Sequence, residues 1–184
     1  MKKLISIFSI LVLIFAFTAC ESKEEKANAR VMANKEKIIE ILRNTDRPGM
    51  EEVIRHLEES DYFTRGAGGH HTEVGGLAQH SLEVYRMMRC IAWFQDSDSI
   101  AITAILHDMG KIDGEGWHPW RSVMHLGEWG FKLTNKEYYA IFFQHKAGWR
   151  YYRSSPLRRA LTFSDIVSTA WWKLWHKSPK VDPE

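Results

Sequence analysis

Apolar and polar residues alternate along most of the chain with the period of an α-helix. The pattern predicts helices over about residues 31–43, 50–59, 77–94, 100–109, 121–133, 135–147 and 156–176. Pro48-Gly49, the glycine-rich stretch TRGAGGHHTEVGG (64–76) and the segment 110–120 interrupt the pattern as loops. No strand-like alternation persists, and no segment repeats. The sequence therefore predicts an all-α domain over residues 31–176, followed by a C-terminal tail at 177–184.

The first twenty residues follow a different pattern. Two lysines precede an apolar run from Leu4 to Phe17, and small residues lead to Cys20, which is the anatomy of a secretory signal. The run is short for a membrane-spanning helix, which needs about 20 residues. The end, FTAC, resembles a bacterial lipobox. We expect residues 1–19 to be a lipoprotein signal peptide and Cys20 to carry lipid; an uncleaved anchor is the alternative.

Either interpretation predicts a membrane-anchored protein outside the cytoplasm, on the periplasmic or cell-surface face. Residues 20–30 are polar and charged and are predicted to be a tether. Loss of residues 1–19 would leave 23 Lys and Arg against 23 Asp and Glu. This balance argues against binding of long nucleic acid, but it is compatible with a small anionic substrate held by a metal.

Two further side-chain types are predicted to serve packing. Cys90 would be the one thiol left besides the lipidated one, and it lies in an apolar helical run, so we expect it to be buried. Trp171, Trp172 and Trp175 have helical spacing, which favours packing in the core or on a membrane surface over stacking against a nucleotide.

Six histidines and aspartates fall on or at the ends of different predicted helices. They are His80, His107, Asp108, His125, His145 and Asp165. Helical bundles build metal sites in this way, with each helix contributing an inward side chain. Imidazole nitrogen and carboxylate oxygen together suit zinc, iron, manganese and similar divalent ions. At a helix end, adjacent His107 and Asp108 can both reach a metal, and Asp108 can bridge two ions. Lys111 then has the spacing to contact a phosphate or to orient the carboxylate.

The strings HHTEVGGLAQHSLEV (70–84), LHDMGKI (106–112) and FSDIVS (163–168) resemble the HD-domain superfamily of metal-dependent phosphohydrolases. The HH…GGL..H version is similar to the subgroup that contains bacterial HD-type exoribonucleases. The resemblance covers about residues 60–170 and implies an HD-domain helical bundle with a metal site in its core.

The resemblance also implies roles for individual residues. His80, His107, Asp108 and Asp165 would be metal ligands, and Asp108 would bridge two ions with Lys111 as catalytic support. His125 (VMHLGEWG) and His145 (FFQHKAG) match the two extra histidines of two-metal members. His118, beside Pro119 in a predicted loop, is the alternative to His125.

The expected activity is hydrolysis of a phosphoester by metal-activated water, with two divalent ions drawn from manganese, iron, zinc, nickel or cobalt. The expected substrate is a nucleotide, a cyclic nucleotide or a short oligonucleotide. His70, His71 and Arg150 are candidate substrate-binding residues; the alternatives are hydrogen bonds that hold the loop and a solvated basic surface. Gly75-Gly76 is expected to let the backbone approach the site closely. A di-iron oxygenase of the same superfamily and a non-catalytic binding lipoprotein remain the competing functions.

Overall fold

The computed structural model describes residues 22–114, 116–145 and 154–176, and all regular structure within them is helical. The α-helices are α2 (Lys23–Arg43), α3 (Met50–Glu59), α4 (Gly76–Ile91), α5 (Ser97–Leu106), α6 (His118–Glu128), α7 (Asn135–Phe142) and α9 (Pro156–Trp175), and η1 (Met109–Asp113) is a short 3₁₀ helix. The predicted all-α class is confirmed.

Local capping explains where the helices begin. Ser22 caps α2 through a reciprocal pair of hydrogen bonds with Glu25, so this helix starts at Lys23, eight residues before the expected start at Val31. The part of the predicted tether that the structure describes is therefore helical. Thr134 and Glu137 form the same kind of capping box at α7, close to the expected start. Cys20 and residues 1–19 lie outside the described residues, as does the tail 177–184.

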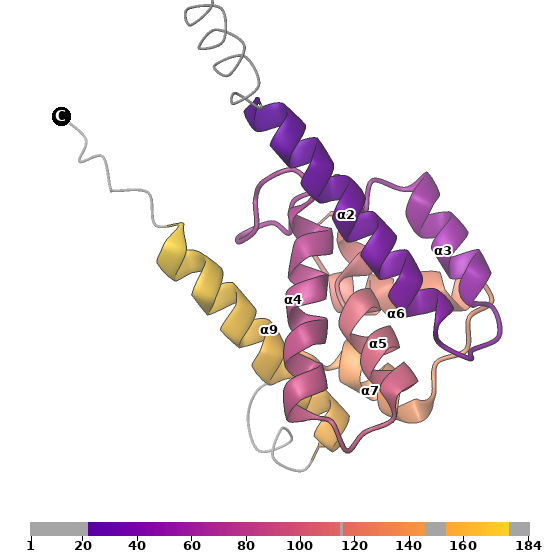
Figure 1. Cartoon of the computed structure of the whole chain (residues 1–184). Helices are drawn as coiled ribbons and strands as arrows, with labels where there is room; N and C mark the ends of the chain where they lie inside the picture. The colour runs from indigo at the N-terminus through magenta and orange to yellow at the C-terminus, as the bar shows by residue number, and fades with distance from the viewer. Residues whose placement is uncertain (1–21, 115, 146–153, 177–184) are drawn as a thin grey trace, which may run out of the picture.

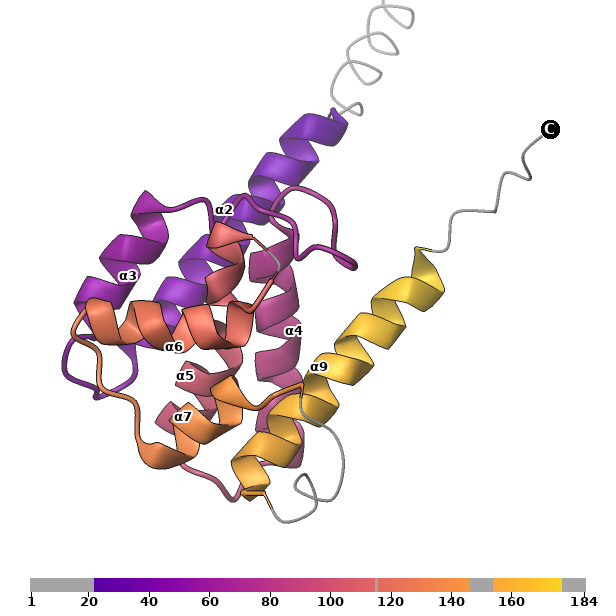
Figure 2. The same ribbon diagram turned by 180° about the vertical axis from the view of Figure 1, so that it is seen from behind.

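Helix α4 lies at the centre of the fold and packs against α2, α5 and α9 (Figure 1). The view from behind shows α6 and α7 across the other face of the bundle (Figure 2). The main core is formed by fully buried aliphatic side chains such as Ile38, Leu57, Leu77 and Ile105. A second core forms where α4 and α5 meet α7 and α9. Burial of these apolar faces fixes the relative positions of the helices that carry the candidate ligands.

The structure bears on two packing predictions. Cys90 is exposed, because it lies on the outer face near the end of α4, so the prediction of a buried thiol was wrong. On α9, Trp171 and Trp175 are 61% and 71% exposed, so these two rings do not pack in the core, and packing on a membrane surface stays a prediction. Within the described residues, no helix is both long and apolar enough to cross a membrane.

Candidate metal centre

The candidate ligands come from separate helices and converge on one face of α4. His80 lies in the second turn of α4, His107 follows the last residue of α5, and Asp165 lies on α9. All three are buried, and one ligand atom of each lies within 4.8 Å of the others. The Nε2 atom of His80 is 3.2 Å from Oδ1 of Asp165. These three predicted ligands are therefore brought together.

Asp108 lies between two histidine groups. Its Oδ2 atom is 3.5 Å from Nε2 of His107 and 3.7 Å from Nε2 of His80. Its Oδ1 atom faces the other way and lies 3.1 Å from Nε2 of His118. Asp108, His118 and His145 form a second cluster whose ligand atoms also lie within 4.8 Å of one another. A carboxylate with one oxygen toward each cluster has the geometry of a bridging ligand.

His118, and not His125, completes the second cluster. The Nε2 atom of His118 is 2.9 Å from Nε2 of His145, whereas His125 contacts Asp113 and Glu128 and stacks on a tryptophan ring. The assignment of His125 to the metal set is thus corrected. The physical reason is that α6 begins at His118 and turns its first residue toward the site, while His125 lies two turns further along the helix.

Close backbone packing brings the start of α6 to the site. A Cβ atom on Gly110 would lie 2.3 Å from the carbonyl oxygen of His118 and 2.6 Å from the backbone nitrogen of Ser122. Ser122 adds to this contact, because its hydroxyl accepts a hydrogen bond from the Gly110 N–H and lies 2.8 Å from the carbonyl oxygen of His107. Only a glycine at position 110 leaves room for this packing.

The unpartnered nitrogens of the first cluster fit a metal ion. Nδ1 of His107 donates to the carbonyl oxygen of Ala104, so Nε2 carries the lone pair. Nε2 of His107 and Nε2 of His80 are buried and have no hydrogen-bond partner among the described residues. Such an arrangement is costly in an apolar core unless the lone pairs bind something. The donor set of imidazoles and carboxylates without thiolate suits zinc, iron or manganese.

The charge states of these groups also suit metal binding. Burial lowers the pKa of His107, which keeps the imidazole neutral as a metal ligand must be. Burial alone would raise the pKa of Asp108, but His107, Lys111 and His118 together hold it well below its usual range. The ammonium of Lys111 lies 2.5 Å from Oδ2 of Asp108 and also donates to the carbonyl oxygen of Ala67. Asp108 is therefore a carboxylate at neutral pH.

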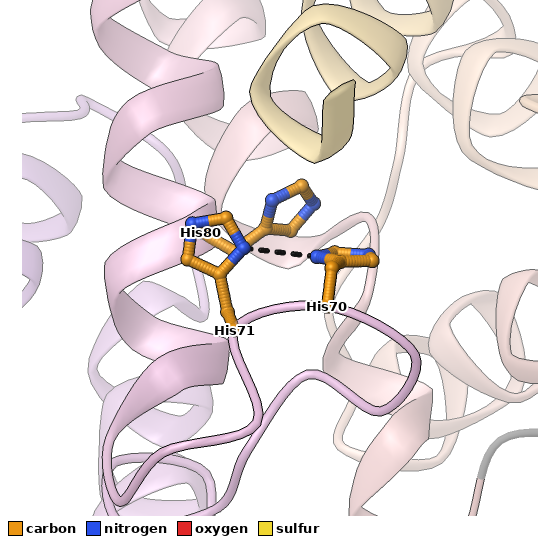
Figure 3. Close-up of side chains that lie close together, drawn as sticks. All are labelled: His70, His71 and His80. Carbon is orange, nitrogen blue, oxygen red and sulfur yellow. Dashed lines mark hydrogen bonds between the residues drawn. The ribbon is translucent and has the colours of Figure 1, made fainter. Parts of the chain in front are cut away.

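The loop before α4 places two histidines next to His80 (Figure 3). A Cβ atom on Gly76 would lie 1.8 Å from the carbonyl oxygen of His71, so the glycine does let the loop pack against the start of α4. His71 has no exposed surface and is hydrogen-bonded to Glu83. His70 is only half-buried, and burial lowers its pKa to about 3.

A pocket of about 510 Å³ opens beside the two clusters. It is lined by Ala67, Gly69, His70, Lys111, His118, His145, Asp165, Ile166, Thr169, Ala170 and Lys173. Of the predicted substrate-binding residues, His70 faces this pocket, while the buried His71 is not among its lining residues. Arg150 lies outside the described residues. Lys111 and Lys173 carry positive charge at the wall of this pocket, which favours an anionic ligand.

One contact at the site was missed by sequence reasoning. Gln144 is fully buried, and its side-chain amide donates to Oδ1 of Asp108 at 3.1 Å. Gln144 directly precedes the predicted ligand His145, and this position is the one feature of the sequence that could have pointed to it. The amide helps to fix the orientation of the carboxylate between the two clusters.

The fold and the paired clusters define a helical metal-binding domain. Comparison with protein families agrees: residues 77–167 match the family model for the HD domain. The match runs from the second residue of α4 into α9 and contains the residues of both clusters. The family consists mostly of metal-dependent hydrolases, and its members bind divalent metals. Comparison with curated proteins and with solved structures found no match.

Proposed function

We propose that this protein is a metal-dependent phosphohydrolase or phosphodiesterase. One observation carries the proposal: Asp108 presents one oxygen to His80 and His107 and the other to His118, beside a lysine-lined pocket. Bound at these ligands, a pair of divalent ions would supply an activated water and neutralise charge on a phosphoryl group. The HD domain supports this class of reaction.

The side chains of the pocket suit a phosphorylated substrate. Lys111 has three N–H donors, of which two contact Asp108 and Ala67, and the third remains for an oxygen in the pocket that it lines. Lys173 is exposed at the pocket wall and would attract an anion as it approaches. Ile166 and Ala170 add an apolar surface to the same wall. We propose a nucleotide, a cyclic nucleotide or a short oligonucleotide as the substrate.

We further propose that the protein acts outside the cytoplasm, held at the membrane through a lipid on Cys20. The support is the order of basic, apolar and small residues before this cysteine. α2 begins at Lys23, so a lipid on Cys20 would hold the helical domain close to the bilayer surface. Labelling with radioactive palmitate, compared between the natural protein and Cys20→Ser, tests this point; a labelled variant would overturn it.

The decisive test of the hydrolase proposal compares the detergent-solubilised full chain with Asp108→Ala and Asp113→Ala. Metal content is measured, and each protein is assayed on bis-p-nitrophenyl phosphate and a nucleotide panel. We expect about two ions per chain and hydrolysis in the natural protein, with both lost in Asp108→Ala. Asp113→Ala is the matched control, because Asp113 contacts His125 and neither cluster. Two irons without hydrolysis would favour an oxygenase, and no bound metal would favour a binding protein.

A further inference from the structure

A chain of hydrogen bonds connects His80, which faces the metal clusters, with His70, which faces the pocket. Nδ1 of His80 is 3.1 Å from the hydroxyl of Ser168 on α9, and this hydroxyl donates to Oε2 of Glu83 at 2.7 Å. The same oxygen is 3.0 Å from Nε2 of His71. Nδ1 of His71 is in turn 3.0 Å from Nδ1 of His70. Figure 3 marks this hydrogen bond with a dashed line. Glu83 lies at the centre of the chain.

The direction of each hydrogen bond follows from the carboxylate at this centre. An ionised carboxylate only accepts, so Ser168 and His71 both donate to Glu83. The single proton of the Ser168 hydroxyl is then used, and its oxygen can only accept from Nδ1–H of His80. His80 must therefore carry its proton on Nδ1 and its lone pair on Nε2. That Nε2 atom is buried without a hydrogen-bond partner among the described residues and points at the cluster with Asp165.

Glu83 also determines the protonation of the two loop histidines, His71 and His70. His71 donates from Nε2 to Glu83, so in its neutral form its Nδ1 atom is an acceptor. His70 then donates from Nδ1 to His71, and its own lone pair lies on Nε2. His70 lines the pocket, whereas His71 does not. One carboxylate thus determines which nitrogen is bare on two different histidines of the site.

We propose that Glu83 is a positioning residue that fixes the tautomers of His80 and His70 for metal binding and for contact with the substrate. The inference rests on the proposed metal-dependent function. A second role for the same contacts is purely structural, since Ser168 joins α9 to α4 through Glu83. The two roles predict different tautomers of His80 in variants that remove these hydrogen bonds: a mixture if Glu83 fixes the tautomer, and no change if the contacts only join the helices.

Glu83→Gln is the variant that keeps the hydrogen bonds. Its amide oxygen can accept from Ser168 and His71, and its NH₂ group would face Gln79, which now donates to Oε1 of Glu83. The side-chain oxygen of Gln79 is buried without a partner among the described residues, so a flip of this amide supplies the acceptor that is needed. Glu83→Leu removes every acceptor. Ser168→Ala removes the hydroxyl that links His80 to Glu83, and leaves the hydrogen bond between His71 and Glu83 in place.

Zinc affinity of the full-length protein, measured by competition with a chromophoric chelator, is the first measurement. We expect Glu83→Leu and Ser168→Ala to bind zinc about 10- to 100-fold more weakly, and Glu83→Gln to stay within about threefold of the natural protein. Glu137→Leu is the control: it removes another buried carboxylate, whose hydrogen bonds among the described residues are to Arg47, Ser99 and Thr134 and to no member of either cluster, and it should leave the affinity unchanged.

Long-range ¹H–¹⁵N spectra of the metal-free proteins are the second measurement. We expect His80 to be protonated on Nδ1 in the natural protein and in Glu83→Gln, and to show a mixture of tautomers in Ser168→Ala and Glu83→Leu. Unchanged zinc affinity and an unchanged tautomer in both disruptive variants would overturn the inference. If the natural protein bound no metal, the proposed function would fail, while the spectra would still decide whether Glu83 fixes the tautomer. Ser168→Ala keeps the test decisive if Glu83→Leu does not fold, as judged by circular dichroism.

Discussion

The Nε2 atom of His118 lies 3.1 Å from Oδ1 of Asp108, although nine residues and a change of helix separate the two positions. His125, on the same helix, contacts Asp113 instead. The contact assigns the second cluster to the start of α6. Substitution of His118 and of His125, which lie on the same helix, can therefore distinguish a metal ligand from a histidine that is only near the site.

We expect His118→Ala to lower the metal content from about two ions per chain to about one, and to reduce phosphodiester hydrolysis by about 100-fold or more. The reason is that the second cluster would keep only Asp108 and His145. His125→Ala should retain both ions and its activity. Metal analysis and the bis-p-nitrophenyl phosphate assay check this pair. The assignment would be wrong if His125→Ala lost the ion and His118→Ala kept it.

Gly110→Ala should destabilise the protein and disturb the second cluster. The added Cβ would meet the backbone of His118 and Ser122 at 2.3 and 2.6 Å, and backbone atoms cannot move aside without shifting α6. We expect a loss of about 1 to 3 kcal/mol of unfolding free energy, measured by urea denaturation of the metal-free protein.

Gly127→Ala, on α6, is the control for Gly110→Ala, which lies in η1. An added Cβ there meets nothing within 4 Å, and the position lies inside α6. Alanine is favoured over glycine within a helix, so this variant should gain about 0.5 to 1 kcal/mol. Equal effects of the two substitutions would show that close packing at Gly110 does not hold α6 in place.

The helical class and much of the site could be predicted because the apolar faces and the HD motif are local features of the sequence. Met50–Glu59 was predicted with its observed bounds, since a turn at Pro48-Gly49 precedes a strongly amphipathic segment. The start of α2 was missed because residues 23–30 are almost all polar, so no apolar periodicity marks them. Their helix is set by the capping pair Ser22 and Glu25.

The choice between His118 and His125 could not be made from spacing alone. It depends on the 3₁₀ turn η1 and on Trp117, whose φ of 60° turns the chain into α6. Neither leaves a periodic signal in the sequence. Close backbone packing at Gly75-Gly76 was predicted from the sequence, but not that it buries His71 and leaves His70 at the pocket, because this depends on how the loop meets α4. The sequence indicated that the candidate metal ligands lie around Asp108, but the packing of the helices determines which histidines reach it.

Arg47→Met should destabilise the fold strongly without changing the metal site. Glu137 has a fully buried side chain and receives two hydrogen bonds from Arg47, at 2.6 and 3.2 Å. Loss of the guanidinium would leave a buried carboxylate without its charged partner, at a cost of about 3 to 5 kcal/mol. Urea denaturation measures the loss. Arg47→Met combined with Glu137→Leu should recover much of it, and a double variant no more stable than Arg47→Met would contradict this account.

The stability of the metal-free protein should fall in acid, in part because of Glu83. Burial alone would raise the pKa of this carboxyl, but hydrogen bonds from His71, Gln79 and Ser168 lower it from 4.5 to about 2. Because the pKa in the folded state is the lower one, the stabilisation is present above pH 4.5 and is lost as the pH falls toward 2. The difference between the two pKa values of Glu83 corresponds to roughly 3 kcal/mol of unfolding free energy. About two thirds of this stabilisation would be lost by pH 3.

Glu83→Gln isolates this contribution, because an amide does not titrate in this range. The unfolding free energy of the natural protein should drop by roughly 2 kcal/mol more than that of Glu83→Gln between pH 5 and pH 3. Urea denaturation at both pH values, with chelator present to remove metal, gives the two differences. Parallel losses in both proteins would mean that the three hydrogen bonds to Glu83 do not favour its ionised form, and would weaken the argument that it holds His80 and His71 as donors.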